Sequence, residues 1–198
     1  MAPEPTVTLG EPGDLQGFPS SAPPGRLWRV CRKEVGSWWF SSDGTGRFDL
    51  EPPKGTCYLA TDGRAAIREA SRLGPVSTTW IGTRQLRQLA PPDPSAPLAA
   101  TTHTRAAAYG VTLELVTVIP YAGPQRWAAA FASRGFAGLR HQLRHDARTR
   151  ASGVSLFGRA GQAPFDEGHQ APLTAATARA AGVAVHPVPS AGELTILK

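Results

Sequence analysis

The chain has 198 residues, enough for one well-packed domain, and 41% of them are hydrophobic. Its formal charge of +6 at pH 7 comes almost entirely from arginine, so the chain attracts anions such as nucleic acid, membrane surfaces and phosphorylated small molecules, although a coding bias toward arginine explains the charge equally well. The first residues lack the basic start and apolar run of a signal peptide, and no stretch approaches the length of a membrane span, so we expect a soluble, cytoplasmic protein.

An irregular arm is predicted ahead of the first element. Residues 1–25 are rich in Pro, Gly and Ser and carry only scattered apolar side chains, of which Leu15 and Phe18 are able to dock on the body of the protein. We expect the remaining residues, 26–198, to form one domain.

Three short strands are predicted next. The first covers residues 26–31, a turn at Asp43-Gly44 separates an aromatic run from a second strand that ends in "RFDL", and the third covers residues 56–61. Cys31 and Cys57 fall in the first and third strands. We expect both to be buried free thiols, because a disulfide scaffold would need more cysteine in a smaller chain.

The clearest predicted helix follows the third strand. Asp62 is a suitable N-cap for "GRAAIREASRL", and Gly74-Pro75 ends the run. At about 3.6 residues per turn, one stripe toward the core is formed by Ala66, Ile67, Ala70 and Leu73. Glu69 falls at the margin of that stripe, so its carboxylate is able to lean over the edge of the preceding strand, where Tyr58 lies.

The second half of the sequence mixes helices and strands irregularly. Helical segments are predicted over 83–90, 102–109 and 123–135. Strands are predicted over 111–118, 136–143, 153–158, 183–188 and 193–197. This irregular order favours the α+β class over a regularly alternating parallel sheet.

Two arginines are candidate anion ligands. The guanidinium of Arg47, in "GTGRF", matches the geometry of phosphate oxygens, and the flanking glycines let a ligand approach the backbone; a solvated turn arginine is the alternative. Arg29 stands in "LWRVC", where alternation places it with Leu27 and Cys31 on one strand face and where it needs an anion or a carboxylate as partner. A structural ion pair is the alternative for Arg29, with one of Glu34, Asp49 and Glu69.

Tyr58 and Glu69 are candidates for the same ligand. The Tyr58 ring is able to stack on an aromatic group, and a core tyrosine is the alternative. Glu69 is a candidate catalytic carboxylate, and a helix-surface glutamate paired with Arg68 or Arg72 is the alternative. No metal site is predicted, because His141 and His145 lack the glutamate of a zinc-binding helix, and no phosphate-binding loop or nucleic-acid recognition pattern is present.

Five segments, taken in order, resemble the RES-domain family, which is named for arginine, glutamate and serine: "LWRV", "GRFD", "CYLATDGRAAIREA", "WAAAFASRGFAGLRHQLRHD" and "GVSLFG". The likeness covers roughly Arg26 to Gly158 and is most specific from Gly46 to Ala70. It implies an α+β fold like that of ADP-ribosylating enzymes, with a mixed sheet core, flanking helices and a cleft for a nicotinamide dinucleotide.

The resemblance also implies a function. Members include toxins partnered with Xre-type antitoxins, and they consume NAD with phosphate as co-substrate, releasing nicotinamide and ADP-ribose phosphate. Some relatives instead modify a protein with ADP-ribose, which stays open as an alternative activity. The implied partners include no membrane and no metal, and nucleic acid only indirectly, through the antitoxin.

The family's two arginines fall on Arg29 and Arg47, its strand aromatic on Tyr58 and its glutamate on Glu69. The resemblance implies that Glu69 stabilises the positive charge that builds on the ribose when the nicotinamide bond breaks. The arginines would hold the pyrophosphate or the incoming phosphate, with Arg47 also counted as catalytic. Tyr58 would stack on the nicotinamide.

The sequence departs from the family at the serine. Leu143 stands at the serine's position, before Arg144, and a leucine cannot hydrogen-bond a phosphate or a carboxamide. Losing one such contact costs about 1–3 kcal/mol. Ser152 and Ser155 on the adjoining strand are candidates to replace it. A catalytically weakened binding module is therefore a further alternative, whereas a nucleic-acid binder rests on the charge alone.

Overall fold

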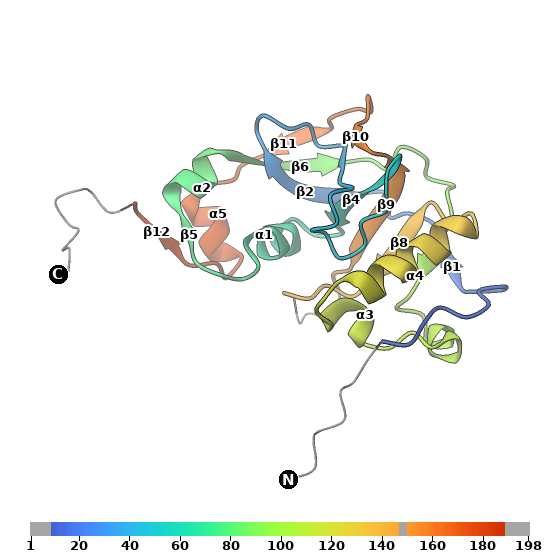
Figure 1. The fold of residues 1–198 in the computed structure, drawn as a ribbon. Coiled ribbons are helices and arrows are strands. Elements are labelled where there is room, and N and C mark those ends of the chain that lie inside the picture. The colour runs from blue at the N-terminus through green and yellow to red at the C-terminus, as the bar shows by residue number, and fades with distance from the viewer. Residues whose placement is uncertain (1–8, 147–149, 189–198) are drawn as a thin grey trace, which may run out of the picture.

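A mixed sheet of eight strands runs through the computed structural model, which describes residues 9–146 and 150–188 (Figure 1). The strand order is β1-β7-β8-β9-β4-β2-β6-β11. In that order the strands cover Ser20–Ser21, Leu98–Ala100, Gly138–His141, Gly153–Arg159, Lys54–Ala60, Leu27–Arg32, Arg84–Leu89 and His169–Ala171. Neighbours are antiparallel except β7 and β8, which are parallel. The mixed sheet with flanking helices confirms the predicted α+β class.

Helices flank both ends of the sheet. Figure 1 shows α1, α2 and α5 grouped beside the β2–β6 end, together with the short parallel pair β5 and β12, and α3 and α4 beside β8. Their bounds are Gly63–Ser71 for α1, Thr78–Gly82 for α2, Glu114–Thr117 for α3, Ala122–Ser133 for α4, Ala175–Ala180 for α5, Val76–Ser77 for β5 and Val185–His186 for β12. A 3-10 helix, η1, covers Thr104–Tyr109, and a small hairpin pairs β3 (Trp39–Phe40) with β10 (Gly161–Gln162).

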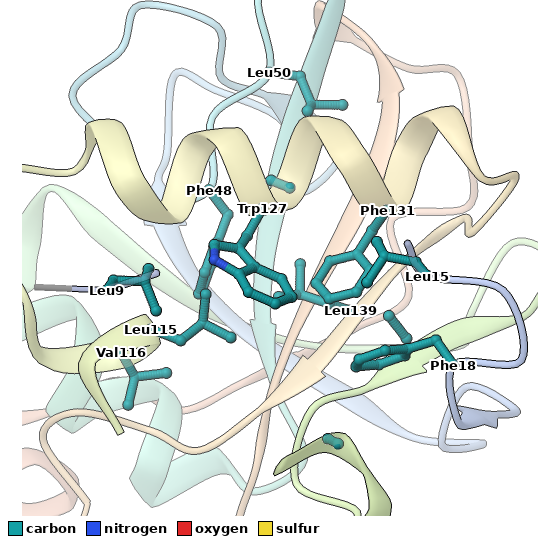
Figure 2. Close-up of a cluster of buried hydrophobic side chains, with 13 residues drawn as sticks. Leu9, Leu15, Phe18, Phe48, Leu50, Leu115, Val116, Trp127, Phe131 and Leu139 are labelled. Carbon is teal, nitrogen blue, oxygen red and sulfur yellow. The ribbon is translucent and has the colours of Figure 1, made fainter. Parts of the chain in front are cut away.

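The first hydrophobic cluster lies between α4 and β8 (Figure 2). Trp127 and Phe131 of α4 are fully buried against Leu139 of β8, as their spacing of one helical turn predicts. Leu15 and Phe18 of the arm enter the same cluster and are also buried, and β1 extends the sheet beside β7. The described part of the arm therefore forms part of the core.

Strand alternation gives the sheet two differently used faces. In β4, Tyr58 and Ala60 point to one face, and Cys57 and Leu59 to the other. Trp28 of β2 pairs with Ala60, so its side chain shares the Tyr58 face. The Cys57 face is packed by a separate apolar cluster with residues of β2, β3, β6, β7 and β9. The Tyr58 face carries α1 and the candidate site.

Several predicted elements are confirmed. Asp62 caps α1, since its side chain accepts a 3.0 Å hydrogen bond from the Ala65 amide. Cys31 and Cys57 are buried free thiols in β2 and β4. The predicted strands at 136–143, 153–158 and 183–188 correspond to β8, β9 and β12, and the one at 193–197 lies outside the described residues.

Three predicted elements are wrong. Residues 83–90 form strand β6 instead of a helix, because six of them pair with β2. Residues 111–118 contain the short helix α3 instead of a strand, with Leu115 and Val116 buried in the α4 cluster. The segment "RFDL" at 47–50 forms a turn instead of a strand, because its backbone and side chains bond within the turn and to β4.

Candidate functional site

A cleft of about 530 Å³ opens on the Tyr58 face of the sheet. It is bordered by β2 and β4, by α1, and by the segments around residues 45–47, 119–121 and 141–145. All four residues predicted as ligands line it: Arg29, Arg47, Tyr58 and Glu69. A second cavity, of about 600 Å³, lies on the opposite face beside Phe40 and Leu156, and its lining contains none of the four.

The turn at residues 46–49 is built around the carboxylate of Asp49. Its Oδ2 accepts hydrogen bonds from the Gly46 amide (2.9 Å) and the Ser41 hydroxyl (3.1 Å), and its Oδ1 accepts one from the Tyr58 hydroxyl (2.7 Å). Only glycine fits at position 46, since a Cβ there would lie 2.3 Å from Asp49 Oδ1 and 2.4 Å from the Tyr58 hydroxyl. The sequence analysis did not identify Asp49 as a site residue, although it is the last residue of the "GRFD" segment that carries the family resemblance.

The hydroxyl of Tyr58 is committed within the protein. It donates to Asp49 and accepts a 2.8 Å hydrogen bond from the Phe48 amide. Burial and the neighbouring Asp49 carboxylate raise the pKa of Tyr58 well above its usual value, so the hydroxyl stays protonated. Tyr58 therefore offers its ring to the cleft and cannot act there as an acid or a base.

One edge of the Arg47 guanidinium is held by the protein, and the other has no partner among the described residues. Its Nη1 donates to the Val118 carbonyl at 2.8 Å, and its guanidinium carbon stacks 4.5 Å from the centre of the Tyr121 ring. Its Nη2 is buried and meets no acceptor among the described residues. A buried N–H donor without a partner is costly, so this edge of the guanidinium is prepared for an anion from outside the chain.

Glu69 lies on the side of α1 that faces the cleft. Its Oε1 accepts a 2.6 Å hydrogen bond from the His145 amide. Burial raises the pKa of the carboxyl, and the His145 hydrogen bond opposes that rise. Within the described ranges no arginine or lysine nitrogen pairs with this carboxylate, so the predicted alternative of an ion pair with Arg68 or Arg72 is not what the structure shows.

Arg29 borders the cleft along its strand, but its guanidinium belongs to the other face of the sheet. Nη1 donates to the carbonyls of Ser37 (2.6 Å) and Trp39 (3.0 Å) and to Cys57 Sγ (2.8 Å). Burial raises the pKa of the Cys57 thiol to about 11, so this contact is with a neutral thiol. The structure thus brings Arg47, Tyr58 and Glu69 together and directs Arg29 Nη1 toward backbone carbonyls behind the sheet.

Leu143 lines the cleft and is buried, with 4% of its surface exposed, in the apolar cluster under α1. Neither serine suggested as its replacement lines the cleft. Ser152 accepts a hydrogen bond from Arg140 Nε (2.9 Å), and Ser155 is fully buried beneath His141. The wall at position 143 is therefore apolar, and neither of the two suggested serines supplies a hydroxyl to the cleft.

His141 is a cleft residue that the sequence reasoning missed. Its Nδ1 lies 2.9 Å from the Gln142 carbonyl, which only accepts, so Nδ1 carries the proton and Nε2 accepts from the Ser155 hydroxyl at 3.0 Å. Burial lowers the pKa of His141 to about 4. Gly153 makes room for the ring, since a Cβ there would lie 2.2 Å from His141 Cε1. Alternation in β8, which puts His141 on the face of Leu139, was the available signal.

The cleft combines excess positive charge with one carboxylate. Arg47, Arg72 and Arg144 line it beside Glu69, and Trp28 and Tyr121 add aromatic surface. This arrangement suits a ligand with phosphate groups, a flat ring and a centre that becomes positive during reaction. Among residues 9–146 and 150–188, no three His, Cys, Asp or Glu side chains gather in a way that could hold a metal ion.

The fold has a counterpart among solved structures. It is similar to a chain in the crystal structure of the M. tuberculosis MbcT-MbcA toxin-antitoxin complex, with a TM-score of 0.60, 15% sequence identity, and coverage of 84% of this chain and 93% of that chain. At that identity the likeness establishes a shared fold. No family model and no curated protein matches the sequence. In the described part of the chain, no helix combines the length and the apolar character needed to cross a membrane.

Proposed function

We propose that the chain is an NAD-consuming toxin that cleaves the bond between nicotinamide and ribose with phosphate as acceptor. The observation that carries the proposal is the cleft itself, which is lined by Arg47, Glu69 and the ring of Tyr58, and where Arg47 Nη2 meets no acceptor in the part of the chain that the structure describes. NAD has the matching groups: a pyrophosphate, a ribose that becomes cationic and a flat base.

The roles follow from the charges. Arg47 would bind the pyrophosphate through Nη2 while Val118 and Tyr121 hold its other edge. As the C1′–N bond breaks, its electron pair neutralises the nicotinamide ring and positive charge develops on the ribose, where Glu69 would stabilise it. An oxygen of phosphate then forms a bond to C1′, which yields ADP-ribose phosphate.

Glu69 would contribute most to turnover. A group raises the rate only when it binds the transition state more tightly than it binds the substrate, and the carboxylate meets a full positive charge only as the bond breaks. Tyr58, whose hydroxyl is committed to Asp49, would contribute ring surface against the base. These roles need no metal.

The partner proposal rests on the fold. The similar chain comes from a structure described as a toxin-antitoxin complex. We infer that this chain is also neutralised by a protein antitoxin, of the Xre type if the family resemblance holds. Co-purification of the chain with the product of a neighbouring gene, and loss of its NAD consumption in that complex, would support the assignment.

One observation favours a second candidate, a binding module with weakened catalysis. Leu143 presents a buried apolar side chain where the resemblance expects a serine, and Ser152 and Ser155 are engaged elsewhere. Such a module would bind NAD without consuming it. A protein ADP-ribosyltransferase would use the same cleft, with a side chain in place of phosphate as acceptor.

The deciding experiment follows NAD and its products with purified protein, with and without phosphate. The wild type is compared with Glu69→Gln and with Glu51→Gln, an exposed glutamate outside the cleft. Phosphate-dependent loss that only Glu69→Gln abolishes is the expected result. Loss that ignores phosphate, with label transferred to polypeptide, would identify the transferase. Binding without loss would identify the binding module.

A further inference from the structure

Two successive residues of α1 hold two successive residues of the segment that closes one side of the cleft. Arg68 Nη1 forms a 2.9 Å ion pair with Asp146 Oδ1, and Glu69 Oε1 accepts a 2.6 Å hydrogen bond from the His145 amide. The same segment carries Leu143 and Arg144 into the cleft lining. The helix therefore fixes this wall at two adjacent points.

The first of these points is buried. The Asp146 side chain has no exposed surface and that of Arg68 is 20% exposed. Arg68 Nε also donates a 2.5 Å hydrogen bond to the carbonyl of Ala181, just beyond α5. Removing one partner from a buried ion pair is strongly destabilising, so this contact contributes to fixing the position of Asp146.

We propose that Arg68 is a positioning residue for Glu69, which acts by anchoring Asp146 so that the neighbouring His145 amide stays on Glu69 Oε1. The His145 amide occupies Oε1, and Oε2 has no hydrogen-bond partner among the described residues. Arg68 is not among the residues that line the cleft, so it influences a ligand there through the residues that it holds, Asp146 and Ala181. The structural part of the inference stands on the contacts alone, and its catalytic consequence rests on the proposed function.

Burial and Asp146 raise the pKa of Glu69, whereas the His145 hydrogen bond, Arg144 and Arg47 lower it. If Arg68 is removed and the His145 amide moves away, the largest opposing contribution is lost and the pKa of Glu69 rises further. The amide of His145 is thus a direct reporter of the arrangement.

The test is a pH titration of the His145 backbone amide by NMR in ¹⁵N-labelled protein. Four proteins are compared: wild type, Arg68→Met, the assignment control Glu69→Gln, and the matched control Arg64→Met, which removes an exposed arginine from the first turn of α1. Glu69→Gln separates the Glu69 titration from that of the His145 ring. We expect the chemical shift of the His145 amide to change with the ionisation of Glu69 in the wild type and in Arg64→Met. In Arg68→Met we expect this change to be lost.

The same titration in Arg68→Met as in the wild type would overturn the inference. If Arg68→Met does not fold, Arg68→Gln decides, because glutamine also removes the charge that pairs with Asp146; a response unchanged from wild type would again count against the inference. Where NAD is consumed, Arg68→Met should lower kcat tenfold or more with a smaller change in KM. The acidic limb of the pH profile of kcat should also move to higher pH. Absence of NAD loss in the wild type would refute the proposed function and leave the NMR result to decide the positioning role.

Discussion

The Tyr58 hydroxyl donates a 2.7 Å hydrogen bond to Oδ1 of Asp49, which ties the central strand of the cleft to the turn that carries Arg47. Asp49 is buried and also accepts hydrogen bonds from Gly46 and Ser41. The Asp49 carboxylate therefore fixes the position of the Tyr58 ring relative to the turn that carries Arg47.

Tyr58→Phe tests this arrangement. The substitution leaves Asp49 Oδ1 and the Phe48 amide without their partner, so we expect a loss of about 1–3 kcal/mol in the free energy of unfolding. Urea denaturation measures it. Tyr109→Phe is the control, because its hydroxyl donates to Gln16 at an exposed position, where water replaces the lost bond. Equal losses in the two variants would contradict the structural role of Tyr58.

Arg47→Met should separate ligand binding from stability. The Nη2 edge has no acceptor among the described residues, but Nη1 loses its hydrogen bond to Val118, so the fold should lose about 1 kcal/mol, whereas a pyrophosphate ligand loses charge-assisted hydrogen bonds of about 1.5–3 kcal/mol. We expect at least tenfold weaker binding of ADP-ribose by calorimetry at fixed ionic strength. Arg126→Met, which removes an arginine paired with Glu11 outside the cleft, should bind as the wild type does. Unchanged affinity in Arg47→Met would exclude it as the pyrophosphate ligand.

Glu69→Gln should change how stability depends on pH. Burial raises the folded-state pKa of Glu69 above its unfolded value, so its contribution to stability is complete below the unfolded pKa and is lost as pH rises through the folded pKa. Glutamine has no such loss. The stability of Glu69→Gln relative to the wild type should therefore increase from pH 4 to pH 7 in urea denaturation, and a decrease would contradict the direction of the shift.

His141 should behave in the opposite way. Its pKa is lowered to about 4, so the neutral ring contributes stability above the unfolded value of 6.5, and this contribution is lost as pH falls toward 4. His141→Gln removes the titration. Between pH 7 and pH 4.5 the wild type should lose more unfolding free energy than the variant. Parallel pH profiles would show that His141 is not held neutral by burial.

Leu143→Ser tests the departure from the family serine. Removing a buried leucine from the cluster under α1 should cost about 2 kcal/mol or more in stability. Leu143→Ala is the matched variant, because it makes the same cavity without a hydroxyl. If a hydroxyl at this wall binds phosphate or the carboxamide, NAD loss should be about tenfold to hundredfold faster in the Ser variant than in the Ala variant. Equal rates would show that this position does not contact the reacting groups.

The β4–α1 unit was predictable because its signals are local. Asp62 starts α1 as predicted, and Glu69 lies beside the cleft. Of the predicted buried stripe, Ala66 and Ile67 are buried, whereas Ala70 and Leu73 are exposed; the helix ends at Ser71, before the Gly-Pro, so Leu73 lies outside it. β6 was not predictable in the same way. Leu86 and Leu89 are three residues apart, which fits a helix, and the pairing with β2 and β11 makes the segment a strand.

The sequence predicted single residues that line the site, but not which partners they contact. Alternation correctly grouped Arg29 with Leu27 and Cys31, but it cannot say which face of the strand fronts the cleft, and the segment around Ser37 and Trp39 covers the Arg29 side. Asp49 and His141 gain their roles from Tyr58 and Ser155, which come from other strands. Partners that meet only through tertiary pairing leave no periodic signal.

The arm has a consequence for synthesis. The Trp127 indole donates to the Gly10 carbonyl across 117 positions of sequence, and Leu15 and Phe18 are buried against the same helix. At about 5–20 residues per second, the ribosome delivers that helix on the order of ten seconds after the arm. Leu15 and Phe18 thus emerge well before the helix that buries them, and the nascent chain has to keep them from other surfaces until α4 is complete.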